Sequence, residues 1–377
     1  MMRSMVLLAA AMALAACNDI SPVEPLGDMS SARSAHGPVV MTRNVYLGAD
    51  LTPLLEAPSA DQVPSIAGTV WSRIQATNFP ARAGGLADEI VQTMPHVIGL
   101  QEAVLYQLQS PGDAVLGGQA PATMVAFDFV QLLLDSLAAR GADYRVIAEG
   151  TGTVVELPVF TGVGPLPFDD VRFTDRDVIL ARGDVAAGNA QAAQFQAGID
   201  LPIGGVGGPV LMQRRGWASV DATVDGVSFR FISTHLEIQA AAPVQAFQAA
   251  ELLAIADASP LPVIMVGDFN SAADGSQTPT YGTILAAGFR DAWHRRGEAG
   301  YTCCHVEDLS NVQPTLDQRL DIIFMRGFGD APGAAIGART ELVGDMTADR
   351  LPSGLWPSDH AGVVAWLRLP PPFIAVN

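Results

Sequence analysis

The chain has 377 residues and a formal net charge of −18, with 21 Lys and Arg residues against 39 Asp and Glu residues. This balance argues against a broad basic surface for duplex DNA, but it does not exclude a phosphate substrate that arrives with a bound cation. The length exceeds that of most single domains, although one large α/β domain or sandwich can reach it.

The N-terminus has the layout of a secretory signal peptide, because Arg3 is followed by the apolar run Val6–Ala16 without an acidic residue. That run is too short to span a bilayer as a stable helix. It ends in Leu14-Ala15-Ala16-Cys17, which resembles a bacterial lipobox, where the cysteine is lipidated and becomes the new N-terminus. The alternative is an ordinary signal peptide with an incidental cysteine. We expect a signal peptide over 1–16, a lipidated flexible tether over 17–38 and one domain over 39–370.

No later run approaches the length of a membrane span. The mature protein is therefore expected to be a monomeric, exported lipoprotein, held through its lipid anchor on the periplasmic side of a membrane or at the cell surface.

Two cysteines follow the leader, and they are adjacent: Cys303 and Cys304. Neighbouring Cα atoms lie about 3.8 Å apart, which is less than the usual separation across a disulfide. The pair is therefore either a strained vicinal disulfide or two free thiols. Together with His305 it resembles a soft-metal site, but no second cluster completes one.

Strands and helices alternate through the first half of the domain. Helical spacing of apolar residues over 62–92, interrupted at Asn78–Pro80, predicts two successive helices, and Gly141 is expected to end a third. The predicted order is a strand at 39–45, the two helices within 62–92, a strand at 96–101, a helix at 124–140, a strand at 144–148, a Gly/Pro-rich excursion through 167, a strand at 177–181 and a long loop over 183–209.

The second half contains a β-hairpin, in which two alternating strands, 216–224 and 227–234, are joined by Asp225-Gly226. The apolar run Pro262–Val266 predicts a strand that is buried on both faces. The remaining predicted elements are helices at 243–258 and 281–287 and strands at 320–325 and 362–367. An antiparallel hairpin argues against a purely parallel sheet, and the strand count favours two packed sheets with helices outside.

Polar residues gather at the ends of these strands. Some of these residues follow the C-terminal end of a strand, and others precede the N-terminal start of one. Strands that run in opposite directions bring both kinds of position to one edge of a mixed sheet. Residues two apart on an extended chain face the same side, so Asp268 and Asn270 are offered together. The predicted edge holds Asn44, Glu102, His235, Asp268, Asn270, Asp321, Asp359 and His360.

The chemistry of this set favours phosphoester hydrolysis. Carboxylate and amide oxygens are hard ligands that suit Mg²⁺, Mn²⁺ or Ca²⁺, and two nearby histidines can move protons. No residue is an obvious covalent nucleophile, and the sequence has no G-x-S-x-G motif. Metal-assisted attack by water therefore fits best.

These motifs resemble those of the endonuclease/exonuclease/phosphatase superfamily, which includes deoxyribonuclease-type nucleases, abasic-site endonucleases, neutral sphingomyelinases and inositol polyphosphate phosphatases. They span about residues 39–367 in family order, and the resemblance implies a four-layer α/β/β/α sandwich of two packed mixed sheets. The motifs are Val-Met-Thr-Arg-Asn44, Ile-Gly-Leu-Gln-Glu102, Ser-Thr-His235-Leu, Gly-Asp268-Phe-Asn270, Arg-Leu-Asp321 and Ser-Asp359-His360.

For the cation, the resemblance implies that Glu102 is the main ligand, helped by Asn44 and Asp359, with Mg²⁺, Mn²⁺ or Ca²⁺ as the cofactor. For the phosphate, it implies that Asn270 holds the group, and we prefer Arg215 over its neighbour Arg214 as a phosphate-binding guanidinium.

For proton transfer, the resemblance implies that Asp268 orients or activates the attacking water. His360 then acts as general base or as a transition-state stabiliser, Asp321 orients a catalytic histidine, and His235 is a candidate acid for the leaving oxygen.

The expected function is hydrolysis of a phosphodiester, in a nucleic acid or a phospholipid, with a nuclease or related phosphodiesterase ranked first. The chain has only 21 Lys and Arg residues and no basic cluster beyond the pairs Arg214-Arg215 and Arg295-Arg296, which weakens the nuclease interpretation. A sphingomyelinase-like lipid phosphodiesterase or a phosphatase is the alternative, and the loop Leu157–Phe168 offers apolar residues for it. A non-catalytic binding lipoprotein is a further alternative, but it would be expected to have lost the histidines or the Glu.

Overall fold

The structure, a computed structural model, describes residues 37–162, 164–204, 210–293, 298–328 and 337–368. The predicted signal peptide, Cys17, nearly all of the tether and the pair Arg295-Arg296 lie outside the described residues. Within those ranges, no helix has both the length and the apolar character that a membrane span requires.

The first sheet is mixed and contains eight strands. β1 runs parallel to β2 and antiparallel to β16, so the end of β1 and the start of β16 lie at the same edge. The strand order is β15 (Gly337–Val343), β16 (Gly362–Arg368), β1 (Val39–Asn44), β2 (Val97–Gln101), β6 (Phe168–Arg182), β3 (Leu105–Gln109) and β4 (Met124–Asp128), with β5 (Tyr144–Phe160) paired to β6.

The second sheet is also mixed and contains six strands. β12 runs parallel to β11 and antiparallel to β14, which repeats the arrangement of the first sheet. The order is β13 (Arg290–Asp291), β14 (Asp321–Arg326), β12 (Val263–Asp268), β11 (Val227–His235), β10 (Gly216–Val224) and β7 (Ala186–Gln194). A separate pair is formed by β8 (Ile199–Pro202) and β9 (Val210–Gln213).

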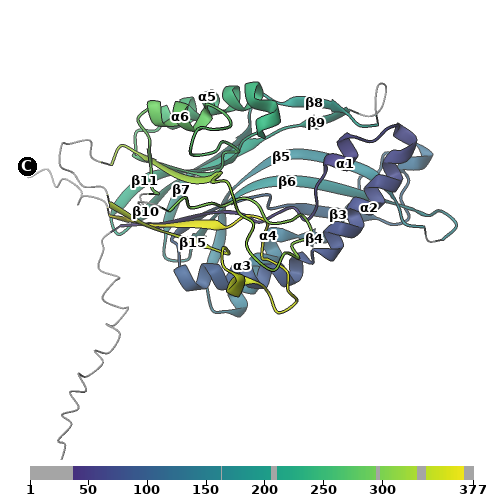
Figure 1. The fold of residues 1–377 in the computed structure, drawn as a ribbon, viewed down its shortest axis with the longest axis horizontal. Coiled ribbons are helices and arrows are strands. Elements are labelled where there is room, and N and C mark those ends of the chain that lie inside the picture. The colour runs from purple at the N-terminus through teal and green to yellow at the C-terminus, as the bar shows by residue number, and fades with distance from the viewer. Residues whose placement is uncertain (1–36, 163, 205–209, 294–297, 329–336, 369–377) are drawn as a thin grey trace, which may run out of the picture. The chain divides into compact units, whose positions relative to one another are not determined.

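Helices cover the outer face of each sheet (Figure 1). Between the sheets lies a separate apolar cluster, to which Val40 and Ile179 contribute from one sheet and Phe231 and Ile264 from the other. This four-layer sandwich confirms the predicted fold class. The helices are α1 (Thr52–Leu55), α2 (Val63–Ala76), α3 (Phe79–Thr93) and α4 (Phe129–Ala139) on the first sheet and α5 (Ala242–Asp257) and α6 (Thr280–Ala286) on the second, with 3₁₀ turns at Ala60–Gln62, Ala114–Leu116, Gln239–Ala241 and Thr347–Asp349.

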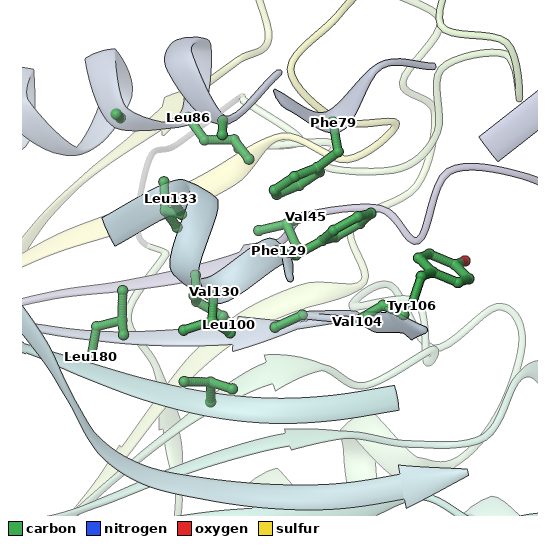
Figure 2. Packing of buried hydrophobic residues seen from close by; sticks show 14 of the residues in the cluster. Val45, Phe79, Leu86, Leu100, Val104, Tyr106, Phe129, Val130, Leu133 and Leu180 are labelled. Carbon is green, nitrogen blue, oxygen red and sulfur yellow. The ribbon is translucent and has the colours of Figure 1, made fainter. Parts of the chain in front are cut away.

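Aromatic packing fixes the helices of the first layer (Figure 2). The rings of Phe79, at the start of α3, and Phe129, at the start of α4, stack with centroids 3.5 Å apart. Tyr106 of β3 meets Phe129 edge-on at 5.8 Å. Such contacts stabilise a core beyond the area that they bury.

Two buried arginines tie this layer to the strand ends. Arg43 pairs with Glu89 of α3 at 2.9 Å and also donates to the carbonyl of His360. Arg82 of α3 donates to the carbonyl of Pro357 at 3.0 Å. Because buried charges are tolerated only when they are paired and hydrogen-bonded, both contacts fix the segment that precedes β16.

One helix is shorter than predicted. The segment Met124–Asp128, which was expected to begin a helix, forms β4 and pairs antiparallel with β3. The helix begins at Phe129 because Asp128 caps it, accepting hydrogen bonds from Val130 N and Gln131 N. An Asp in this role ends a strand and starts a helix at the same residue.

Two predicted loops contain strands. β5 has 17 residues and extends to Phe160, so it includes most of the segment that was predicted as an excursion through Pro167, and β6 begins directly after that segment. β7 and β8 lie within the predicted loop 183–209. All nine residues of β7 are exposed, and its backbone pairs with β10, so its conformation depends on a neighbour and not on its own composition. The strands β3 and β15 were also not predicted, whereas the two helices of 62–92 and the hairpin are confirmed.

Candidate active site

The predicted edge forms at the point where the two sheets meet. In the second sheet, Asp268 lies directly between His235 and Asp321 in the strand register. In the first sheet, Asn44 lies opposite Gln101, so Glu102 follows immediately. The carboxamide nitrogen of Asn44 links the sheets, since it lies 3.0 Å from Glu102 Oε1 and 3.2 Å from Asp268 Oδ2.

Two polar residues of the site adopt a left-handed backbone, which is uncommon outside glycine. Glu102 has φ 55° and Asn270 has φ 46°. Each follows a strand, and the turn directs its side chain back toward a strand end: Glu102 Oε2 accepts a hydrogen bond from Leu47 N at 2.7 Å, and Asn270 Nδ2 donates to Leu236 O at 3.0 Å. Strained backbone of this kind concentrates at functional sites.

Asp268 lies between the two histidines. Its Oδ2 atom is 3.6 Å from His235 Nε2 and 3.8 Å from His360 Nε2. His360 is held from behind, because its Nδ1 lies 2.8 Å from Asp321 Oδ2. The structure thus brings one carboxylate and two imidazoles together, with a second carboxylate, that of Asp321, behind His360.

The two histidines have opposite protonation behaviour. Burial alone lowers the pKa of His360, but the carboxylates of Asp321 and Asp359 outweigh it and raise this pKa well above the ordinary value. Burial, reinforced by the positive charge of Arg215, lowers the pKa of His235 well below the ordinary value. These opposite shifts favour an imidazolium at His360 and a neutral ring at His235, a separation that commonly distinguishes acid and base roles.

Arg215 contacts His235 directly, with Nη1 2.9 Å from His235 Nδ1. An arginine can only donate, so Nδ1 accepts and the proton of the neutral ring sits on Nε2, toward Asp268. Asn270 Nδ2 also lies 3.1 Å from Nε2, but it has a carbonyl acceptor at Leu236 O, 3.0 Å away. The predicted phosphate-binding role of Arg215 stays a prediction; its contact here is with His235.

The guanidinium of Arg215 is itself held by two acids that sequence reasoning did not place in the site. Asp175 lies 3.5 Å and Glu237 3.7 Å from it. Glu237 directly follows the motif His235-Leu, and the two-residue turn of the hairpin sets Trp217 opposite Thr234, which brings Arg215 close to His235. The sequence therefore contained a signal for Glu237, which follows the motif, and for the position of Arg215 near His235, which the hairpin sets. No pattern in the sequence marked Asp175.

Replacing Arg215 with Gln is expected to lower kcat about 10- to 100-fold with little change in KM, because His235 loses the donor that fixes its tautomer. Nitrogen-15 NMR of the histidine ring should show a higher pKa for His235 and a mixture of tautomers. Arg214→Gln is the matched control, since the side chain of Arg214 pairs with Asp200 at 2.8 Å and not with a histidine. Equal losses in both variants, or an unchanged His235 spectrum, would contradict this role.

The carboxylates of the site suit a hard divalent cation. Burial, with a contribution from Asp321, raises the pKa of Asp268 to about 6. Burial, with a contribution from Glu102, raises the pKa of Asp359 to about 7, although His360 opposes the shift. A bound cation stabilises the ionised forms of buried carboxylates that repel one another, and Mg²⁺ prefers oxygen ligands of this kind.

The three predicted ligands differ in their present contacts. Glu102 accepts two hydrogen bonds, whereas Asn44 Oδ1 accepts one from Tyr46 N at 3.0 Å and keeps a second lone pair. The roles of Asn44, Glu102 and Asp359 as metal ligands stay predictions. Ser358, the first residue of the motif Ser-Asp359-His360, was assigned no role from the sequence. It supports this segment, since its hydroxyl donates to Asn44 O at 2.8 Å and accepts from His360 N at 3.2 Å.

Magnesium is expected to stabilise the protein more at pH 7.5 than at pH 5. The folded-state pKa values of Asp268 and Asp359 lie above the ordinary 3.8, so the stability that these groups contribute is complete below about pH 4 and is lost as the pH rises through 6 to 7. A bound cation offsets this loss by about 2.7 kcal/mol at 100 times its Kd. Thermal melts with and without Mg²⁺ check this, and an equal or larger effect at pH 5 would contradict it.

A cavity of about 450 Å³ opens beside these residues. Asn270 contributes to its wall, as do both cysteines, which form a vicinal disulfide. The cavity is lined by Ile238, Gln239, Ala240, Asn270, Gln277, Cys303, Cys304, Thr315, Asp317, Gln318 and Leu320.

Comparison with known proteins identifies the family to which this chain belongs. The model of the Endonuclease/Exonuclease/phosphatase family matches residues 44–360, and the chain belongs to this family. No curated protein matches. As a member of the family, the chain is a phosphoester hydrolase of the phosphodiesterase and nuclease type, and the family generally uses divalent metal ions.

The chain is also similar to solved structures of low sequence identity. An endonuclease/exonuclease/phosphatase family protein from Leptotrichia buccalis is 15% identical, with a TM-score of 0.52 over 88% of this chain and 99% of that one. A family protein from Bacteroides thetaiotaomicron is 15% identical, with a TM-score of 0.49 over 88% and 94%. The D. rerio TDP2, solved with a single-strand DNA product, is 17% identical, with a TM-score of 0.48 over 88% and 98%.

Proposed function

We propose that the protein is an exported phosphodiesterase that depends on a divalent metal ion and cleaves its substrate by attack of water. One observation carries this proposal: Asp268 Oδ2 lies within 4 Å of both His235 Nε2 and His360 Nε2, while Asp321 holds His360 from behind. A carboxylate between a neutral and a charged imidazole can position a water molecule and stabilise the charge that develops on a phosphate.

Glu102 and Asp359 would hold the cation, with Asn44 as a third oxygen donor. When bound, a divalent cation supplies positive charge that neutralises the phosphate and favours the ionised form of a water molecule. Its presence would also favour ionised forms of Asp268 and Asp359, whose pKa values burial raises in the metal-free protein.

The chain's own groups would divide the remaining work. Asp268, once ionised, accepts a proton from the attacking water, and the amide of Asn270 donates to a phosphate oxygen. The imidazolium of His360 stabilises the negative charge of the transition state, which favours this role over that of general base. His235 donates from Nε2 as a neutral ring, so it stabilises the leaving oxygen by a hydrogen bond.

A lipid phosphodiester is the second candidate substrate, after nucleic acid. Large apolar side chains are exposed on the long strands and the small hairpin near them: Phe160 at 45%, Val210 at 59% and Met212 at 61%. β5 and β9 are neighbours in the fold, and exposed apolar side chains on neighbouring strands favour contact with a membrane or an apolar ligand. A non-catalytic binding protein is disfavoured, because each histidine and carboxylate of the predicted set is present.

The test of this proposal is a panel of substrates offered to one preparation of the full chain: bis-p-nitrophenyl phosphate, plasmid DNA, RNA, sphingomyelin vesicles and a phosphate monoester. Hydrolysis of at least one diester, with the monoester cleaved far more slowly, is the expected result. Cleavage of the monoester alone would replace the proposal with a phosphatase. Exclusive cleavage of sphingomyelin would establish the second candidate.

Export and anchoring rest on the sequence of the first seventeen residues. The expected result is metabolic labelling of the protein with a fatty acid in a bacterial host, and loss of this label in a Cys17→Ser variant. A Cys17→Ser variant that is still labelled with lipid would overturn the proposed anchor.

A further inference from the structure

The vicinal pair Cys303–Cys304 lies against a catalytic residue, and the proposed mechanism does not use it. Cys304 Sγ is 3.8 Å from His360 Nε2. The two sulfur atoms and this nitrogen all lie within 4.8 Å of one another. The pair also lines the cavity of about 450 Å³, so small solutes can reach it.

We propose that reduction of Cys303–Cys304 creates, together with His360, an inhibitory site for thiophilic divalent ions such as Cd²⁺ and Zn²⁺. Two thiolates and an imidazole are soft or borderline ligands, which select such ions over Mg²⁺. The site thus differs in chemistry from the oxygen ligands of Glu102 and Asp359, which suit a hard cation.

His360 is already arranged as a metal ligand. Its Nδ1 lies 2.8 Å from Asp321 Oδ2, which leaves Nε2 as the nitrogen that faces Cys304. Histidines that bind metals through one nitrogen usually donate from the other to a carboxylate or a carbonyl, which fixes the ring. The same Asp321 that serves catalysis would therefore serve this second ligand set.

The backbone holds both cysteines in place independently of their bond. Cys303 N donates to Gln318 O at 2.9 Å, and Gln318 N donates to Cys303 O at 3.0 Å. The carbonyl of Cys304 accepts from Thr315 Oγ1 at 2.9 Å. Reduction therefore releases two thiols that remain beside His360.

The chemistry balances as two steps. A dithiol or phosphine reductant supplies two electrons, the S–S bond breaks, and each sulfur takes up one proton. The metal ion then displaces the two thiol protons and the proton of His360 Nε2, and forms two bonds to sulfur and one to nitrogen. Because Nε2 is then occupied, His360 no longer stabilises the phosphate, and hydrolysis stops.

Cadmium binding to the full chain tests this site, with Cys17→Ser as the background so that Cys303 and Cys304 are the only thiols. The reduced protein should bind one Cd²⁺, seen by calorimetry and by the ultraviolet charge-transfer absorption of a cadmium thiolate, and the oxidised protein should not. Cys303→Ser and Cys304→Ser should each weaken binding at least tenfold. His305→Gln, which changes the adjacent histidine outside the site, should bind normally.

Inhibition is measured on the same samples with bis-p-nitrophenyl phosphate and excess Mg²⁺, each variant being compared with its own rate without Cd²⁺. Reduced protein should lose at least 90% of its activity at one equivalent of Cd²⁺. Equal binding by oxidised protein or by Cys304→Ser would overturn the site, and so would full activity with Cd²⁺ bound. This inhibition rests on the proposed function, but the binding measurements do not. A failure of the proposed metal site can therefore be told apart from a failure of the proposed function.

Discussion

Replacing Glu102 with Gln is expected to lower kcat/KM for bis-p-nitrophenyl phosphate by about 10²- to 10³-fold. The carboxylate is the central oxygen donor of the proposed cation site, and each 1.36 kcal/mol of lost transition-state stabilisation lowers the rate tenfold. A bound metal contributes several kcal/mol of such stabilisation. The substitution keeps the shape of the side chain, so the effect reports on charge. The measurement is steady-state hydrolysis across Mg²⁺ concentrations.

Glu56→Gln is the matched control, because this substitution makes the same chemical change at an exposed position. It should retain activity within about twofold, as surface substitutions usually do. The Glu102 variant should also lose the thermal stabilisation by Mg²⁺ at pH 7.5. A Glu102→Gln variant with near-normal activity and a normal Mg²⁺ response would remove this residue from the site.

Replacing Asp321 with Asn should lower kcat by about 10²- to 10⁴-fold. Removing a carboxylate that orients a catalytic histidine has an effect of this size in other enzymes, because the ring loses its orientation and its charged form. Here the 2.8 Å contact with Nδ1 is one cause of the raised pKa of His360. The pKa of His360 should therefore fall in the variant, and the alkaline limb of the pH–rate profile should move to lower pH.

Asp291→Asn provides the control for loss of a buried carboxylate in the same sheet. Asp291 pairs with Arg319 at 2.6 Å and accepts from Tyr281 Oη at 2.9 Å, so its loss should lower the melting temperature. Its kcat should stay within a few-fold of the wild type. Equal losses of kcat in the Asp291 and Asp321 variants would point to general destabilisation and not to a role of Asp321 in catalysis.

The strand ends could be predicted from the sequence because each polar motif directly follows or precedes a short apolar run. Val263–Asp268 is buried throughout, and an apolar run of this length that ends in Gly-Asp leaves little choice about where the strand stops. The opposite directions of β12 and β14 then place Asp268 beside Asp321. The layout of the edge therefore followed from strand direction alone.

Elements without a sequence pattern of their own could not be predicted. β7 reads Ala-Ala-Gly-Asn-Ala-Gln-Ala-Ala-Gln and is exposed along its length, so neither alternation nor propensity marks it as a strand. In Met124–Asp128, the apolar residues are interrupted only by Asp128 before α4 begins, and the spacing of the combined segment indicated one helix. In both segments, pairing with a neighbouring strand decided the conformation.

The protonation states of the histidines depend on contacts that local sequence does not contain. Arg215 and His235 are twenty residues apart, and the acids that surround Arg215 come from β6 and from the segment after β11. His360 was predicted as a general base or a stabiliser, and only the position of Asp321 and Asp359 favours the second role.

Removal of metal tests the central claim most directly. The protein is treated with EDTA, freed of the chelator and assayed with bis-p-nitrophenyl phosphate before and after addition of Mg²⁺ or Mn²⁺, while bound metal is measured in parallel. The proposed site predicts that hydrolysis falls at least a hundredfold on removal of the metal and returns with about one equivalent of added ion. Full hydrolysis by protein that contains far less than one metal ion per chain would contradict it.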